Sequence, residues 1–199
     1  MTSVAALVRR APGPAAFLLA ATAVFTTVGL VRGIGFLWIY LPALVASIAI
    51  VVAIDRRRGP IPTGLLWLLV IWAAAHLAGG LAANPTGKTE ILYGMWLIDG
   101  ALRYDQLVHG FGIAGAVATL AYAARGTRHP RMWGFALGQT VGLVNETAEN
   151  IFAQFIEGSN VGDAVNTAWD LGWHAIGGAV AWAWMAWRRF PTAGGRTFR

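Results

Sequence analysis

The stretch from Ile61 to Ala82, IPTGLLWLLVIWAAAHLAGGLA, contains no Asp, Glu, Lys or Arg. A helix needs roughly 20 mainly apolar residues to cross a hydrocarbon core about 30 Å thick, so this stretch is long enough to span a membrane. Similar runs recur along the chain of 199 residues, of which 57% are hydrophobic and 12% are charged. A soluble domain carries about 25% charged residues. The sequence therefore predicts an all-α, polytopic membrane protein.

Six apolar runs are bounded by charged residues, Gly or Pro, and we predict one transmembrane helix in each, within a single domain of residues 1–199. The predicted spans are 14–31, 34–54, 61–82, 104–124, 132–154 and 167–187. The first span lacks a clear small-x-small cleavage site, so we expect a retained helix rather than a signal peptide. Over the chain ends and alternate loops, twelve basic residues fall on one side of the membrane and three on the other. Because basic residues are enriched in cytoplasmic loops, both termini are predicted to be cytoplasmic.

The composition excludes several classes of function. The chain has no Cys, which excludes disulfides, iron–sulfur clusters and thiolate ligands. The net charge of +6 comes from Arg residues beside apolar runs, a pattern of membrane topology, so no nucleic acid partner is predicted. The sole Lys, Lys88, lies in a predicted loop, which excludes a retinal Schiff base within a span. In the same loop, Trp96 is expected at the membrane interface on a short surface helix.

The last three predicted spans hold most of the ionisable residues that lie in apolar sequence. These are Asp105, His109, Glu146, Glu149, Asp170 and His174, whereas the first three spans hold His76 alone. Burying a charged group in the membrane costs about 3 kcal/mol, so these side chains are expected to face the interior, pair with each other or bind a ligand. The predicted topology puts all of them at a similar depth in the outer half of the membrane. We therefore predict one polar site near the outer surface.

Each of these three spans carries two ionisable residues on one helix face, because the members of each pair are three or four residues apart. The pairs are Asp105 with His109, Glu146 with Glu149, and Asp170 with His174. Glycines precede Glu146 and follow His174 at four-residue steps, namely Gly134, Gly138, Gly142 and Gly178. Small residues at this spacing mark close helix contacts in membranes, so both rows are expected to point inward.

The mixture of imidazole and carboxylate groups suits a divalent metal ion, with zinc or iron favoured and copper or manganese as alternatives. Metal ligands are predicted among Asp105, His109, Asp170, His174 and His76. Glu146 or Glu149 is predicted to act as general base toward metal-bound water, and Arg103 to bind an anionic head group. Two other interpretations stay open: His76 also fits a packed interior histidine, and each Asp–His pair also fits an intrahelical ion pair.

Three phrases in the second half of the chain resemble the YjdF-like membrane proteins and, more distantly, the VanZ-like group. They are RYDQLVHGF at 103–111, NETAE at 145–149 and GDAVNTAWD at 162–170. Those families likewise place a Tyr-Asp-x-x-x-His phrase, an acidic residue and an Asp-rich phrase at the corresponding positions. The resemblance covers residues 103–178 and implies a bacterial inner-membrane protein with an envelope or lipid role. His174, four residues after Asp170, departs from the family pattern and favours the metal site.

We therefore predict a membrane-embedded, metal-dependent enzyme that acts on a lipid-like or amphipathic substrate in the outer leaflet, with the loop 157–163 opening the site to the outside. Hydrolysis by metal-bound water is favoured over oxidation at a two-metal centre. The alternative is a non-enzymatic membrane factor, such as a small transporter, an ion-binding protein or an envelope partner subunit, that uses the same polar groups. Membrane lipids are the predicted partners, and a homo-oligomer remains an alternative to a monomer.

Overall fold

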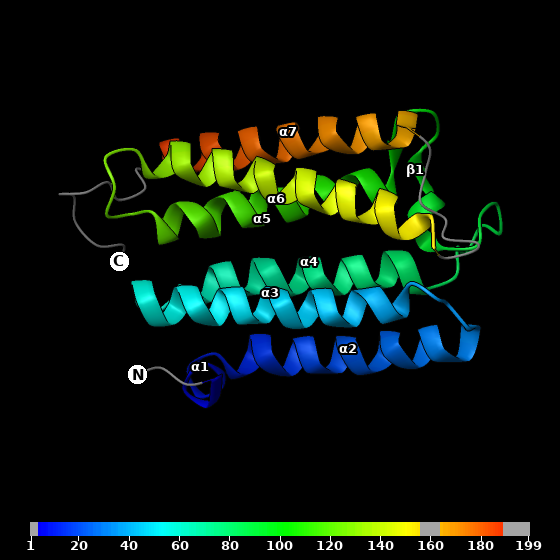
Figure 1. The fold of residues 1–199 in the computed structure, drawn as a ribbon, viewed down its shortest axis with the longest axis horizontal. Helices are drawn as coiled ribbons and strands as arrows, with labels where there is room; N and C mark the ends of the chain where they lie inside the picture. The colour runs from blue at the N-terminus through cyan, green and yellow to red at the C-terminus, as the bar shows by residue number, and fades with distance from the viewer. Residues whose placement is uncertain (1–3, 156–163, 189–199) are drawn as a thin grey trace. The chain divides into compact units, whose positions relative to one another are not determined.

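The computed structural model describes residues 4–155 and 164–188, and this part of the chain is almost entirely helical (Figure 1). A short helix, α1 (Val4–Arg10), comes first. The long helices that follow are α2 (Pro12–Arg32), α3 (Leu37–Arg58), α4 (Thr63–Leu81), α5 (Tyr104–Ala123), α6 (Pro130–Ala153) and α7 (Ala164–Trp187). Each long helix coincides with one of the predicted apolar runs, so the all-α fold is confirmed.

Within the described ranges, four helices are long and apolar enough to cross a membrane, namely α2, α3, α4 and α5. The helices α6 and α7 have 24 residues each, which also exceeds the length of a span. The helices α6 and α7 carry most of the ionisable groups discussed above, and they are not among the four helices that are apolar enough to cross a membrane. The class of all-α membrane protein is thus confirmed, whereas the count of six spans and the cytoplasmic side of both termini stay predictions.

Two sequence predictions fall outside the described residues. One is the polar loop 157–163, which the sequence predicts to open the site to the outside. The other concerns Arg189, Arg196 and Arg199, which contribute to the count of basic residues behind the predicted orientation.

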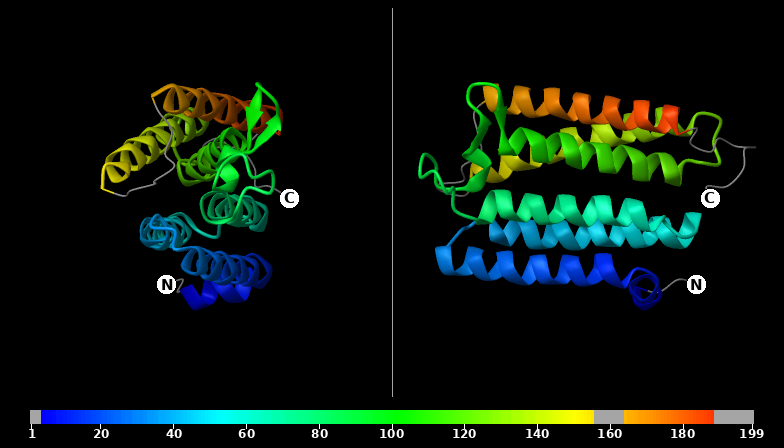
Figure 2. Two further views of the ribbon diagram at one scale, coloured as in Figure 1. Left: turned by 90° about the vertical axis from the view of Figure 1, so that its right-hand side faces the viewer. Right: turned by 180° about the vertical axis from the view of Figure 1, so that it is seen from behind.

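The helices gather into two compact units. Among the described residues, the first consists of 4–108 and 150–155, and the second of 109–149 and 164–188. In the first unit, α2, α3 and α4 run side by side, as Figure 2 shows, and Leu37, Leu77 and Leu81 form a buried core there. In the second unit, the core consists of Ile113, Val117 and Ala121 from α5 with Ala181 and Met185 from α7.

A short β-hairpin precedes α5, where the sequence predicts a loop with a surface helix. A 3-10 turn, η1 (Leu92–Gly94), leads into β1 (Trp96–Ile98), which pairs antiparallel with β2 (Leu102–Arg103). Gly100, between the strands, has a φ of 70°, a conformation that Gly adopts without steric strain. Trp96 therefore lies on a strand opposite Arg103, whose guanidinium carbon is 4.6 Å from the centre of the Trp96 ring.

An ion pair between Arg10 and the buried carboxylate of Asp55 ties α1 to the end of α3 in the first unit. Nη2 of Arg10 lies 2.6 Å from Oδ1 of Asp55, and Nη1 donates to Oδ2 at 3.3 Å. The backbone N–H of Ile61, just before α4, also donates to Asp55 Oδ1, at 2.8 Å. Asp55 is only 2% exposed. Because a buried carboxylate is costly unless it is paired, this network holds α1 and the start of α4 at the end of α3.

We expect Arg10→Met to destabilise the protein by about 3 kcal/mol, because it leaves the buried carboxylate of Asp55 without its positively charged partner. The effect is measured as a lower midpoint of thermal unfolding in detergent. Arg9→Met is the matched control, since Arg9 is exposed on the same helix and the change in net charge is identical. Equal midpoints for the two variants would show that the ion pair carries no net stability.

Candidate metal centre

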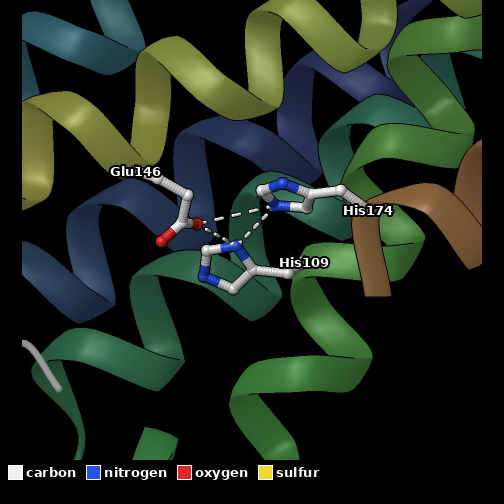
Figure 3. Close-up of side chains that lie close together, drawn as sticks. All are labelled: His109, Glu146 and His174. Atoms are coloured by element: carbon white, nitrogen blue, oxygen red, sulfur yellow. Dashed lines mark hydrogen bonds and ion pairs between the residues drawn. The ribbon is translucent and has the colours of Figure 1, made fainter. Parts of the chain in front are cut away.

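Three ionisable side chains from three helices meet within the second unit. His109 comes from α5, Glu146 from α6 and His174 from α7, and Figure 3 shows them turned toward a common point. Nδ1 of His109 lies 2.8 Å from Nε2 of His174 and 3.1 Å from Oε1 of Glu146. The distance from His174 Nε2 to Glu146 Oε1 is 3.7 Å. We call these three residues the His–Glu–His cluster.

The cluster is almost completely shielded from solvent. His109 is 6% exposed, Glu146 is 3% exposed and His174 is 2% exposed. Ionisable groups at this depth have lost their hydration and need a compensating partner. Each residue offers a nitrogen or oxygen that can bind a divalent ion, and the three atoms lie within 4.8 Å of one another. The cluster therefore has the composition and the proximity of a metal-ligand set.

Glycines let the helices approach closely enough for these side chains to meet. The buried residues of α6 are Pro130, Gly134, Gly138, Gly142 and Glu146, at four-residue steps. A Cβ at Gly142 would lie 2.6 Å from Nδ1 of His174, and one at Gly177 would lie 1.9 Å from the carbonyl oxygen of Gly110. Such distances leave no room for a side chain larger than hydrogen. The predicted inward orientation of the glycine row on α6 is confirmed.

The side chain of Gln139 holds the backbone of α7 at the cluster, a contact for which the sequence analysis has no prediction. Its Nε2 donates to the carbonyl oxygen of His174 at 3.1 Å. Gln139 lies seven residues, about two helical turns, before Glu146, so both are on the same side of α6. The position of Gln139 seven residues before Glu146 is the feature of the sequence that could have indicated this contact.

A family profile described as "Predicted membrane protein (DUF2238)" matches residues 14–190 of the chain. The match extends from the first turn of α2 past the end of α7 and includes the whole His–Glu–His cluster. The chain belongs to this family. Neither a curated protein nor a solved structure gave a match. Together with the four apolar helices, membership makes this DUF2238 protein an integral membrane protein.

The DUF2238 protein has a second buried carboxylate beside the cluster. Asp170 lies one turn before His174 on α7 and is 2% exposed. Its Oδ2 accepts a hydrogen bond of 2.6 Å from Nδ2 of Asn166. One of its carboxylate oxygens lies within 4.8 Å of a ring nitrogen of His109. Asp170 and His109, both predicted ligands, are thus close neighbours.

Glu146 and Glu149 have different surroundings on α6. The sequence predicts either of them as a general base, and the structure brings the carboxylate of Glu146 beside both imidazoles. Glu149 is half-buried, and its Oε1 accepts a hydrogen bond of 2.9 Å from Nδ2 of Asn145. Its role as a base stays a prediction.

Three further predicted site residues belong to the first unit of the DUF2238 protein. Asp105 lies in the first turn of α5, one turn before His109 on the same helix face. Arg103 lies on β2, and its backbone N–H donates to Oε1 of Gln106 at 2.9 Å. Their roles as a metal ligand and a head-group binder stay predictions.

His76, the third of these residues, has aromatic neighbours. Its ring centre lies 5.0 Å from that of Tyr40 and 5.4 Å from that of Trp72, and its Nδ1 is hydrogen-bonded to the hydroxyl of Tyr93. Among the described residues, the groups with metal-ligand spacing do not include His76. These contacts match the interpretation of His76 as a packed interior histidine, and its role as a ligand stays a prediction.

Proposed function

We propose that this DUF2238 protein binds one divalent metal ion through His109, Glu146 and His174 and uses it to hydrolyse a lipid-like substrate in the membrane. One observation carries the proposal: Nδ1 of His109, Oε1 of Glu146 and Nε2 of His174 come together from three helices at mutual distances of 2.8, 3.1 and 3.7 Å.

The size of this triangle fits a small divalent ion. A circle through three atoms at these separations has a radius of about 1.9 Å, and zinc lies roughly 2.0–2.2 Å from its nitrogen and oxygen ligands. The three atoms are therefore close enough together to bind the same ion. In catalytic zinc sites, three protein ligands leave the fourth position for water or substrate.

Electrostatics also favours a cation at this point. A neutral imidazole nitrogen carries either a hydrogen or a lone pair, and an ionised carboxylate offers lone pairs only. A single hydrogen between the two imidazoles can bridge one of the three close pairs, whereas a divalent ion attracts all three atoms at once. The buried position strengthens this attraction, because little water is present to screen it.

Two imidazoles and one carboxylate form a ligand set used by zinc hydrolases. In this proposal Glu146 is a ligand, and the base is Glu149, three residues further along α6. A bound divalent ion would supply the Lewis acidity that activates water for attack on the carbonyl carbon or phosphorus of an ester, and Glu149 would accept the proton of that water. The ester bond would break, and the proton would pass from Glu149 to the departing alcohol.

The position of the cluster supports a lipid-like substrate. His109 lies five residues after the start of α5, roughly 8 Å along a helix that is apolar enough to cross a membrane. An amphipathic molecule can bring a polar ester to this depth while its hydrocarbon chain stays in the bilayer. We also propose that the protein lies in a bacterial inner membrane and is related to the YjdF-like and VanZ-like proteins.

A second candidate function is a metal-free proton relay in a small transporter or partner subunit. It is favoured by the distance of 2.8 Å between the imidazole nitrogens of His109 and His174, which suits an N–H of one ring donating to the other. Buried histidines and acids in membrane helices form such relays. Metal content separates the two candidates.

We expect about one equivalent of zinc per chain when the protein is purified in detergent and analysed by mass spectrometry of the elements, because the triangle accommodates one ion. Removing zinc with a chelator is expected to abolish hydrolysis of fluorogenic ester and phosphodiester lipids, and one equivalent of zinc to restore it. Bound iron would instead indicate oxidation. Protein that stays metal-free after reconstitution would exclude the metal site, and proton flux in proteoliposomes would then test the relay.

A further inference from the structure

We infer that Asp170, held by Asn166, is a positioning residue that orients the ring of His109 toward the metal ion. The inference rests on the proposed metal site and adds a carboxylate that acts on the site through a ligand. It assigns Asp170 a role different from that of the ligand predicted from the sequence.

The placement of Asp170 is the first argument. Asn166, Asp170 and His174 follow one another at four-residue steps, so α7 presents all three on one side. Asp170 is 2% exposed, and one of its oxygens lies within 4.8 Å of a ring nitrogen of His109. Among the described residues, the ligand-distance group that contains Glu146 and His174 does not contain Asp170. A second such group contains both Asp170 and His109, so Asp170 lies beside His109 and outside the set of three proposed ligands.

The chemistry of imidazole ligands is the second argument. A histidine that binds a metal through one nitrogen commonly uses its other N–H to bond a carboxylate or carbonyl, which fixes the tautomer and the orientation of the ring. Nδ1 of His109 already faces Glu146 and His174. A buried carboxylate beside the same ring limits its rotation and strengthens it as a ligand.

The hydrogen bond from Asn166 is the third argument. Nδ2 of Asn166 donates to Oδ2 of Asp170 at 2.6 Å, which restrains the carboxylate from one side. A buried carboxylate so restrained keeps a defined orientation, which a positioning residue requires. On α7, Asn166 therefore holds Asp170 beside His109 of α5, and the next turn of α7 provides His174 as a ligand.

The test uses full-length protein in detergent, titrated with Co²⁺ as a spectroscopic substitute for zinc. Asp170→Asn keeps the side-chain shape and removes the charge, and we expect Co²⁺ affinity to fall by about tenfold to a hundredfold. We also expect the visible absorption of bound Co²⁺ to change, because one ligand is reoriented. Asn166→Ala should act in the same direction with a smaller effect.

Asn145→Ala is the matched control, because it removes the corresponding bond from an Asn to a carboxylate four residues later, on α6. We expect its Co²⁺ affinity to equal that of the wild type. Unchanged Co²⁺ affinity and absorption in Asp170→Asn would overturn the inference. This holds even if the unfolding midpoint of the variant falls, because a lower midpoint with unchanged Co²⁺ binding indicates a purely structural role. If Asp170→Asn does not fold, Asn166→Ala decides: lower affinity at an unchanged midpoint supports the inference, and unchanged affinity overturns it.

The two proposals fail differently. Wild-type protein that binds Co²⁺, together with His174→Ala that does not, upholds the metal site even when Asp170→Asn behaves like the wild type. Wild-type protein that does not bind Co²⁺ overturns both proposals.

Discussion

His174→Ala is expected to lower zinc affinity by roughly a hundredfold to a thousandfold and to reduce lipid hydrolysis to background. Structural zinc sites bind with about 10–16 kcal/mol shared among about four ligands, so losing one ligand costs about 2.5–4 kcal/mol. The affinity is measured by competition with a fluorescent zinc chelator in detergent. Glu146→Gln, which keeps the side-chain size, is expected to give a comparable loss.

His129→Ala is the control for this experiment, because His129 is an exposed histidine in the same unit. A second check is the double variant of His174→Ala with Glu146→Gln, which should hydrolyse lipids no more slowly than either single variant, since residues that act as a unit are not additive. If His174→Ala binds zinc with wild-type affinity, the His–Glu–His cluster is not the zinc-binding site.

Gly177→Ala is expected to disable the site without altering any ligand. Its Cβ would lie 1.9 Å from the carbonyl oxygen of Gly110, and a helical carbonyl cannot rotate aside. The helices α5 and α7 must then separate by roughly 1 Å or more to restore van der Waals contact. Gly110 directly follows His109, and Gly177 lies three residues after His174, so this displacement acts at both imidazoles.

We expect Gly177→Ala to lower hydrolysis by about a hundredfold, the usual effect of a 1 Å misplacement. Overpacking should also destabilise the protein by about 1–3 kcal/mol. Gly172→Ala is the matched control on the same helix, where an added Cβ has nothing within 4 Å. It should keep full hydrolysis at an equal or higher unfolding midpoint, because Ala favours a helix over Gly by about 1 kcal/mol. Wild-type hydrolysis in Gly177→Ala would show that α5 and α7 do not approach this closely.

The helices are predictable from the sequence because an apolar run of sufficient length has few alternatives in a membrane. The run 61–82 becomes α4, from Thr63 to Leu81. Helix ends are less predictable, because local contacts decide them. Gly33, with a φ of 67°, ends α2, and α3 continues to Arg58, beyond Asp55, whose carboxylate Arg10 neutralises. The sequence predicts an end at residue 54, since nothing in it reveals that partner.

The candidate site is predictable in its residue types and only partly in its partners. The four-residue steps on α6 correctly predict that Glu146 and the glycines before it face inward. Which neighbours Glu146 meets depends on the rotation and axial offset of α5, α6 and α7. Close contacts set these offsets, such as the approach of Gly142 to the ring of His174. Spacing along one helix carries no information about such offsets, so the sequence predicts that Glu146 shares a polar site with both imidazoles but does not predict which atoms come together.

The cluster draws one group from each of three consecutive helices, and its two imidazoles are 65 residues apart in the chain. Because a ribosome delivers the chain from its N-terminus onward, α7 is synthesised after α5 and α6. The proposed centre is therefore complete only after α7 has been synthesised, and nascent chains stalled before α7 lack the donor His174. A bound ion would then link α5, α6 and α7 much as a covalent cross-link does, and would oppose their separation.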